Sequence, residues 1–534
     1  MMKSPLLLVI VLFTSFSIQA QVPKWQWAKG DTTAKINGTA THVVAATHNT
    51  VLWGQALKRT GPSSATGGYK VSEFDSAGNY LTSVNITGNF TLIDAHPDDA
   101  GNWYLLGQYT DTINFPGGLQ YIRNPFAFPS GPEYFMLRLN SGSLSMAWTQ
   151  HIGTNNYSTA SAFTIANGKI YIVIDSVTTF INTLDLATGN RTVLWSQTGL
   201  SRVSSIAVDN AGNIYVAGNC SNNIISFNGH VDSFANFYNN YIVRYKANGN
   251  FDWVIWMGDL TCTPRELSLV SNNFIYYSGP LNDSLTIGSF HLHKPFTIGN
   301  GFMAARIDSS GDVSWARQDN DSASATANMD NVYDAVVTND SCLNLCLKVR
   351  GSMNFGNGVS TTALSTQTLA TLVCIKPDST TKWLKQIGCQ QMSSNHLASN
   401  GKDVYITGNG YDNTAISFDS LVIPVTLLNA HVPFVAKLNA IATHPGSYVA
   451  PLNEINLTIA PNPATSTVNI LGMEKAGKAV LVTLTDVYGK VVFSKKYAAP
   501  NGREEIQVGS YPRGLYFVAV STDEFKTVQK IVLQ

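Results

Sequence analysis

Two pairs of residues in the sequence have the types and spacing of metal ligands. His291 and His293 lie two positions apart, so on a β-strand both imidazole rings would point to one face. Cys342 and Cys346 are separated by a step that zinc ligands also use. Neither pair is accompanied by the further ligands that complete a zinc site. We therefore predict no metal and no cofactor, and we interpret the histidines as exposed strand or rim residues.

A segment from Gly472 to Ala479 has the glycines and the lysine of a phosphate-binding loop. Ala479 stands where that motif needs a hydroxyl for magnesium, and the residues from Val480 onward have the pattern of a strand, not of the helix that would receive the phosphates. We interpret the segment as a turn. The oxygen-rich segments 75–79 and 209–213 lack the spaced acidic residues of a calcium loop and are also interpreted as turns.

Features of the whole chain exclude other functions. Lysine and arginine together number 34, as do aspartate and glutamate, and charged residues make up only 13% of the chain. The chain therefore has no net positive charge that would attract nucleic acid, and we predict no nucleic-acid partner. The sequence has no nucleophile elbow, zinc-protease helix or dinucleotide fingerprint. On this basis we assign no catalytic residues.

The first twenty residues have the pattern of a secretory signal peptide. Lys3 is followed by the apolar run 6–13 and by small residues that end at Ala20. We predict cleavage after Ala20, so that the protein passes through the periplasm. No later segment has the length of apolar sequence that a membrane helix needs, so we expect no transmembrane segment. Export makes disulfides between the six cysteines chemically possible, but the sequence does not fix their pairing.

A repeated hairpin indicates how the rest of the chain folds. The clearest copy, residues 205–218, alternates apolar and small residues on both sides of Asp209-Asn210-Ala211-Gly212. With 42 glycines and 22 tyrosines, the composition also suits short strands and tight turns, so the fold class is all-β. Related copies occur at 43–54, 92–107, 162–175, 267–279, 332–347 and 397–408.

Each hairpin is followed by a third strand and then a fourth. The fourth strand usually carries a tryptophan, in the series Trp25, Trp148, Trp195, Trp253, Trp315 and Trp383. We interpret this series as packing between sheets in preference to a sugar-stacking surface. The third strands place Arg138, Arg244, Arg306 and Lys437 at equivalent positions, which we interpret as partners of nearby turns and not as a basic ring.

Four strands repeated about every 60 residues predict the blades of a β-propeller. We predict seven blades over residues 21–440, with insertions between the second and third strands of a blade. The last blade lacks its tryptophan strand, and the segment from Trp25 to Gly30 is such a strand without a hairpin. We therefore predict a seven-bladed β-propeller closed by the N-terminal strand, with Trp25 beside the strand 433–439. The repeats over 22–440 resemble bacterial extracellular β-propeller repeats.

Residues 452–534 have a different sequence pattern, with seven short apolar segments. These segments predict a small C-terminal β-sandwich after a linker at 441–451. This stretch resembles the type A sorting domain of the type IX secretion system of Bacteroidetes. The motif residues that carry the resemblance are Pro461, Asn462, Pro463, Asp486, Gly489, Lys490, Val491, Gly514, Tyr516, Val518, Lys530, Ile531 and Leu533. The resemblance implies passage across the outer membrane by the type IX machinery, with removal of the domain and release or attachment to surface lipopolysaccharide.

These patterns predict a secreted or cell-surface β-propeller that acts without catalysis, as a scaffold or by binding a protein or a glycan through its rim loops. The alternative is a secreted hydrolase or lyase that acts on polysaccharide at the propeller axis, which would require acidic residues converging in one cleft. Sequence spacing does not decide between them, because a ring brings distant residues together.

Overall fold

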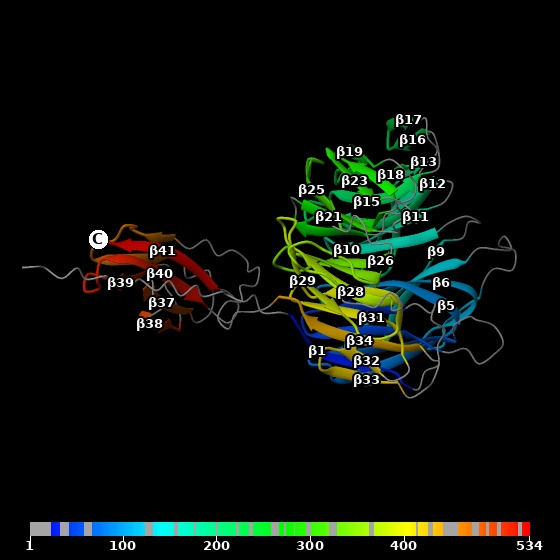
Figure 1. The fold of residues 1–534 in the computed structure, drawn as a ribbon, viewed down its shortest axis with the longest axis horizontal. Helices are drawn as coiled ribbons and strands as arrows, with labels where there is room; N and C mark the ends of the chain where they lie inside the picture. Colours follow the sequence, from blue (N-terminus) through cyan, green and yellow to red (C-terminus); the bar gives the residue numbers. More distant parts are fainter. Residues whose placement is uncertain are drawn as a thin grey trace, which may run out of the picture. The chain divides into compact units, whose positions relative to one another are not determined.

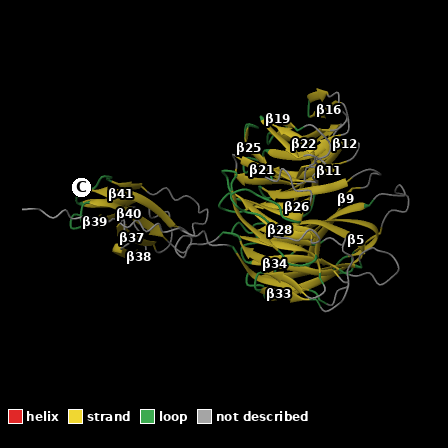
Figure 2. Ribbon diagram, viewed as in Figure 1, coloured by secondary structure: helices red, strands yellow, loops and turns green. Residues whose placement is uncertain are grey.

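The computed structural model contains β-strands as its regular elements in the residues that it describes (Figure 2). Among these residues no helix is long and apolar enough to cross a membrane. The chain divides into two compact units, Met1–Ala442 and Thr443–Gln534. The structure describes residues 23–534 except 33–41, 58–66, 123–131, 154–158, 176–177, 199–200, 221–223, 234–238, 258–265, 272–273, 282, 295–300, 320–327, 362–367, 413–414, 426–430, 442–457, 473–479, 487–490, 499–502 and 522–525.

Small antiparallel sheets follow one another along the first unit (Figure 1). Three of them stand as separate four-stranded sheets, and in each the strands pair in chain order apart from inserted hairpins. Their strands are β10 (Thr159–Ala166), β11 (Lys169–Asp175), β12 (Thr178–Asp185) and β13 (Arg191–Thr198); β14 (Ser201–Val208), β15 (Ile214–Cys220), β18 (Asn239–Tyr245) and β19 (Phe251–Trp256); and β20 (Glu266–Ser271), β21 (Phe274–Leu281), β24 (Gly301–Asp308) and β25 (Val313–Gln318).

One long strand, β5 (Tyr80–Pro97), is both the last of one group of four paired strands and the first of the next group. Its first half pairs with β4 (Gly68–Asp75) and its second half with β6 (Trp103–Asn114), and the register shifts between Gly88 and Phe90. The sequence predicts two separate strands here. A single strand forms because the chain bends at Gly88, which has a φ of +135°. Only glycine fits at this bend, since a Cβ on residue 88 would lie 2.3 Å from the Thr112 carbonyl oxygen. The other strands are β2 (Val43–Ala46), β3 (Thr50–Ala56), β4 (Gly68–Asp75), β6 (Trp103–Asn114), β8 (Glu133–Leu139) and β9 (Met146–Gly153).

The N-terminal strand β1 (Lys24–Gly30) completes the last set of strands in this unit. It pairs antiparallel with β34 (His431–Asn439), and Trp25 lies opposite Leu438, so the predicted neighbourhood of Trp25 is present. β34 pairs in turn with β31 (Asp403–Tyr411), and β31 with β30 (Gln391–Ser399). The same sheet contains β26 (Asn328–Val337), β27 (Leu343–Arg350), β28 (Thr368–Ile375), β29 (Thr381–Gln386), β30 (Gln391–Ser399) and β31 (Asp403–Tyr411).

Short hairpins fill several of the insertions between second and third strands. In the insertion after β15, Asn228 and Gly229 both have positive φ, as a two-residue hairpin turn requires. The inserted strands are β7 (Gln120–Ile122), which pairs with β6; β16 (Ile224–Phe227) with β17 (His230–Ser233); β22 (Asp283–Ile287) with β23 (Phe290–Lys294); and β32 (Ala415–Phe418) with β33 (Leu421–Pro424).

The hydrophobic core of the first unit lies between successive sheets. Tyr276 of β21 belongs to the same buried cluster as Val332 of β26 and Leu345 of β27. Second and third strands such as β15 are buried on nearly every residue, whereas the fourth strand β19 is only partly buried. Each sheet therefore needs a neighbour on both faces, which explains the nearly continuous apolar runs of the second strands.

The second unit contains two antiparallel sheets that share one buried cluster, which includes Val468, Val482 and Ile531. One sheet has the order β35 (Thr458–Ala460), β36 (Thr467–Leu471) and β39 (Arg503–Gln507). The other has the order β38 (Val491–Tyr497), β37 (Val480–Asp486), β40 (Gly514–Ser521) and β41 (Lys526–Leu533). β41 is therefore an edge strand.

Candidate functional site

The structure brings together sorting-motif residues that are distant in the sequence. Asn462 donates from Nδ2 to the carbonyl oxygen of Lys530 at 2.9 Å, and its Oδ1 accepts the Val532 N–H, also at 2.9 Å. The next backbone contact is made by Ala464, whose N–H donates to the Val532 carbonyl oxygen at 2.8 Å. The Pro461-Asn462-Pro463 motif therefore lies against the C-terminal strand β41.

Other motif residues lie around the same sheet. The buried Tyr516 donates its hydroxyl to the Pro512 carbonyl oxygen at 2.8 Å, which holds the turn before β40. Gly514 pairs with Leu533, and Asp486 pairs with Tyr516. Gly489 and Lys490 lie outside the described residues, as do the predicted cleavage site at Ala20 and most of the linker 441–451.

A second polar group, which sequence analysis does not identify, lies on strands β5, β26 and β30 of the first unit. His96 Nε2 lies 3.0 Å from Asp94 Oδ2 on β5, and His396 Nδ1 of β30 lies 3.3 Å from Asp334 Oδ2 of β26. These four side chains keep between 14% and 39% of their surface exposed, so solvent reaches them. We call them the Asp–His group.

The charges of the Asp–His group influence one another across the sheets. Burial opposes ionisation of His96, but Asp94 and then Asp334 outweigh it and raise the pKa of His96 above its usual value. Burial also opposes ionisation of His396, and Asp334 and Asp94 again raise the pKa. For Asp94, burial alone would raise the pKa, yet His96 and His396 lower it. The two ion pairs therefore form one interacting set.

Backbone groups also occupy the two carboxylates. Asp334 Oδ1 accepts the Ala335 N–H and Oδ2 accepts the Leu397 N–H, each at 2.7 Å. Asp94 Oδ1 accepts the Ala95 N–H at 2.7 Å. Asp334 therefore connects β26 to β30, so the geometry favours fixing adjacent strands over exchanging protons with a substrate.

The fully buried His42 makes a neutral connection between β3 and β31. Its Nδ1 accepts the Ala56 N–H at 3.0 Å, so the proton of the ring is on Nε2, which donates to Asn409 Oδ1 at 2.6 Å. Burial lowers the pKa of His42 to about 4, because desolvation outweighs the contact with Asn409.

Tryptophans of the fourth strands reach the next sheet, which confirms the packing interpretation of the series. The Nε1–H of Trp253 donates to the Ser309 carbonyl oxygen at 3.1 Å, and that of Trp148 to the Leu186 carbonyl oxygen at 3.0 Å. At the N-terminus the residue in this role is Trp27, which donates to the Ser76 carbonyl oxygen at 3.2 Å. Trp25 instead packs against Phe418. The prediction that placed Trp25 in the series is therefore wrong, because Trp27 is the residue that lies opposite Lys437, as Trp253 lies opposite Arg244.

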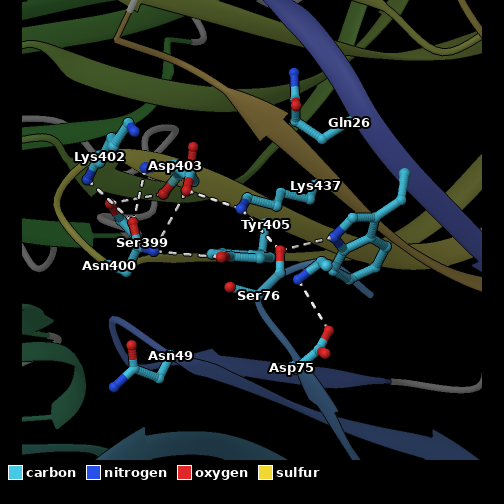
Figure 3. A network of polar contacts seen from close by, with 12 residues as sticks. Gln26, Asn49, Asp75, Ser76, Ser399, Asn400, Lys402, Asp403, Tyr405 and Lys437 are labelled. Atoms are coloured by element: carbon cyan, nitrogen blue, oxygen red, sulfur yellow. Dashed lines mark hydrogen bonds and ion pairs between the residues drawn. The ribbon is translucent and has the colours of Figure 1, made fainter. Parts of the chain in front are cut away.

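Polar contacts follow the same junction between β34 and the turn after β4 (Figure 3). Lys437 Nζ donates to the Ser76 carbonyl oxygen at 2.9 Å and lies 3.0 Å from Asp403 Oδ2. Asn400 donates from Nδ2 to the Tyr405 hydroxyl at 3.3 Å in the same network. The third-strand cation is thus paired locally, as interpreted from the sequence.

Arg244 behaves in the same way, whereas the guanidinium of Arg306 lies 3.7 Å from the ring centre of Phe274. Arg244 forms ion pairs with Asp209 and Asp252, and its guanidinium lies 5.3 Å from the ring centre of Tyr215. Asp209 also accepts the Asn213 N–H at 2.8 Å, which is the contact of a turn residue. The interpretation of segment 209–213 as a turn is therefore supported by its own hydrogen bonds.

The remaining candidates do not converge on a site. His291 and His293 are exposed on β23, as interpreted, and among the described residues no three potential ligands gather around a metal position. Cys342 and Cys346 are both buried, as are the other described cysteines, Cys220, Cys374 and Cys389, and these five form no disulfide with one another. Residues 473–479 of the phosphate-loop segment lie outside the described part, and Val480 begins strand β37 as predicted.

Comparison with known proteins identifies two parts of the chain. Residues 458–534 match the family model of the secretion system C-terminal sorting domain, and residues 199–225 match that of the β-propeller repeat. The second match includes the hairpin 205–218 that sequence analysis singles out. Among curated proteins, the comparison gives no match.

Several solved structures are similar at low identity. A protein of unknown function from Bacteroides caccae has 14% identity and a TM-score of 0.28, and the match covers 52% of this chain and 81% of that one. The Pan2 WD40 domain of Neurospora crassa has 8% identity and a TM-score of 0.38, with coverage of 76% and 91%. For Sqt1 of Saccharomyces cerevisiae these values are 9%, 0.34, 94% and 97%.

The two family matches agree with the resemblances drawn from the repeats and from the C-terminal motifs. A sorting domain implies interaction with the type IX secretion machinery and export to the cell surface or the extracellular space. The chain is therefore a β-propeller protein that carries a C-terminal sorting domain of the type IX secretion system.

Proposed function

We propose that the protein is a seven-bladed, closed β-propeller that acts at the cell surface or in the medium as a non-catalytic binding or scaffold module. The propeller spans residues 21–440, a linker spans 441–451, and a sorting β-sandwich spans 452–534. The observation that carries the proposal is the sorting-domain match at 458–534.

Contacts between first strands support a closed ring. The first strand of each proposed blade contacts the first strand of the next blade, and the last contacts the first, in the order β2, β5, β10, β14, β20, β26, β30 and β2 again. A buried cluster also joins Trp27 and Val435 of the last sheet to Val51 and Trp53 of β3. A closed ring leaves no unpaired sheet edge at the junction of the termini, because β1 covers β34.

Deletion of residues 452–534 tests the export role. In a cell with a working type IX system, the full chain should reach the surface or the medium, with cleavage after Ala20. The truncated chain should collect in the periplasm, and its propeller should stay resistant to protease because it has its own core. Normal export of the truncated chain would refute the proposal. If the exported protein is retained on the cell, its shift to a ladder of larger species would indicate attachment to lipopolysaccharide.

The binding role rests on the insertions between second and third strands. The hairpin β16–β17 leaves Ile224 and Val231 exposed by 65% and 59%, and β33 leaves Val422 exposed by 57%. Exposed aliphatic side chains on a rigid scaffold are suited to contact a protein or a glycan. A binding screen of the exported protein against glycans and surface proteins tests this role, with the hairpin residues 224–233 replaced by a short turn as the comparison.

The Asp–His group favours a second candidate, a hydrolase or lyase acting on polysaccharide at the axis. It contributes two carboxylates, Asp94 and Asp334, from first strands of different sheets. Under this candidate the exported protein would release reducing ends or unsaturated sugars from a polysaccharide, and D94N and D334N would abolish the release. We rank this candidate second because backbone N–H groups occupy both carboxylates.

A further inference from the structure

The sorting domain ends in an edge strand whose free side is partly covered by the start of the same domain. β41 pairs with β40 on one side only. On its other side, Ala464 and Leu533 form a parallel bridge, and the Gln534 N–H donates to the Ala464 carbonyl oxygen at 2.8 Å. The C-terminus of the chain is therefore held in a fixed position.

Asn462 performs the part of this attachment that depends on a side chain. A carboxamide offers one donor and one acceptor side by side, so it pairs with a strand edge as a neighbouring strand would. Its two contacts, to the Lys530 carbonyl oxygen and the Val532 N–H, use both groups. Aspartate has no donor and would place a charge against the Lys530 carbonyl, and alanine would make neither contact.

The attachment also fixes which side chains the outer face of this sheet presents. Phe517 lies opposite Lys530 in the register of β40 and β41. Phe517 is 37% exposed, and Lys530 is exposed beside it. A phenyl ring and a cation next to each other suit a protein surface that offers an apolar contact and a carboxylate.

We propose that Asn462 is a positioning residue, and that the surface formed by Phe517, Lys530 and the Pro461-Asn462-Pro463 segment docks onto an acidic face of a protein of the export machinery. The proposal rests on the export function proposed above. It means that the machinery recognises a folded arrangement of residues that are far apart in the sequence, and that the last strand alone does not carry the signal.

Point variants of the full chain test the proposal in cells with a working type IX system. K530E leaves the contacts of Asn462 in place, because those contacts use the backbone of residue 530. It should lower export about tenfold, the change expected when one favourable charged contact is lost at an interface. K496E is the matched control, since Lys496 is exposed on β38 at the opposite edge of the same sheet. F517S should also lower export, whereas K496E should not.

Variants of Asn462 separate positioning from folding. N462A and N462D should accumulate in the periplasm, and limited proteolysis should still yield an intact C-terminal fragment. If that fragment is lost, K530E and F517S decide the question, because neither alters the attachment of β41. Normal export of K530E and F517S would overturn the docking surface, and normal export of N462A would overturn the positioning role. Truncation at residue 451 distinguishes these failures from failure of the export function: its normal export would refute that function as well.

Discussion

Lowering the pH below 6.5 should lower the free energy of unfolding of the first unit, because His42 stays neutral in the folded chain and is protonated in the unfolded chain. This ring is buried and neutral, and both of its nitrogens are engaged: Nδ1 accepts the Ala56 N–H, and Nε2 donates to Asn409. A second proton on Nδ1 would remove the contact with Ala56 and leave a buried cation, so the folded state resists protonation.

The size of the effect follows from the two pKa values. The unfolded chain takes up the proton near the usual value of 6.5, whereas the folded chain does so only at about 4. The unfolded state therefore binds more protons between these values, and the free energy of unfolding falls as the pH drops through this window. A shift of this size corresponds to at most about 3 kcal/mol. Below pH 4 this contribution is fully lost.

Other ionisable groups act mainly outside this window. The pKa values of His96 and His396 are raised, so their ion pairs stabilise the fold below about pH 6.5 and lose this effect as the pH rises through the folded pKa values. The pKa of Asp94 is lowered, so its contribution is lost only as the pH falls below the usual carboxylate range. Burial also lowers the pKa of His431, so the stability change between pH 6.5 and 4 should come from His42 and His431 together.

Urea unfolding followed by tryptophan fluorescence measures this change in the full chain. All 10 tryptophans precede residue 442, so the signal reports the first unit alone. H42Q keeps one acceptor for Ala56 and one donor for Asn409 but cannot titrate, so it should flatten the decline in stability between pH 6.5 and 4. H48Q alters an exposed histidine and should leave the decline unchanged. An equally steep decline in H42Q would show that His42 is not its source.

Two further predictions concern the contacts between sheets, and both are measured as changes in unfolding free energy at pH 7. W253F removes the hydrogen bond to Ser309 and should cost about 1 kcal/mol for that bond. W195F should cost less, because the indole N–H of Trp195 has no partner among the described residues, and equal costs would contradict the role of the hydrogen bond. G249A should cost about 2 kcal/mol, since Gly249 has φ +84° and a Cβ would lie 2.8 Å from Trp195. G229A, at φ +99° with no atom within 4 Å of its Cβ, should cost less; the reverse order would exclude close packing as the cause.

Local turn chemistry explains which parts of the fold the sequence predicts well. In the hairpin 205–218, Asp209 accepts the Gly212 N–H through its backbone and the Asn213 N–H through its side chain, so the turn is encoded within five residues. Inserted hairpins such as β16–β17 are missed, although Asn228-Gly229 is a strong hairpin signal. The single strand β5 is missed because its bend depends on the close approach of Thr112 to Gly88, which only the folded chain reveals.

The Asp–His group is unpredictable for a different reason. A strict alternation would place residues of a first strand on known faces, but β26 has register shifts between residues 329 and 331 and between 332 and 334. Each bulge reverses the faces of the residues that follow, so sequence alone does not reveal that Asp334 meets His396. Their separation of 62 residues reflects one repeat along the chain and not a motif.

The hydrogen bonds that the carboxylate oxygens of the Asp–His group already accept are the best guide to what this group does. A general acid or base must exchange its proton with a substrate, and a nucleophilic carboxylate must present a free oxygen to it. Asp334 uses Oδ1 for Ala335 and Oδ2 for both Leu397 and His396. Replacing Asp334 would therefore remove the hydrogen-bond acceptor of the Leu397 N–H on β30. This is the expected property of a residue that joins neighbouring strands.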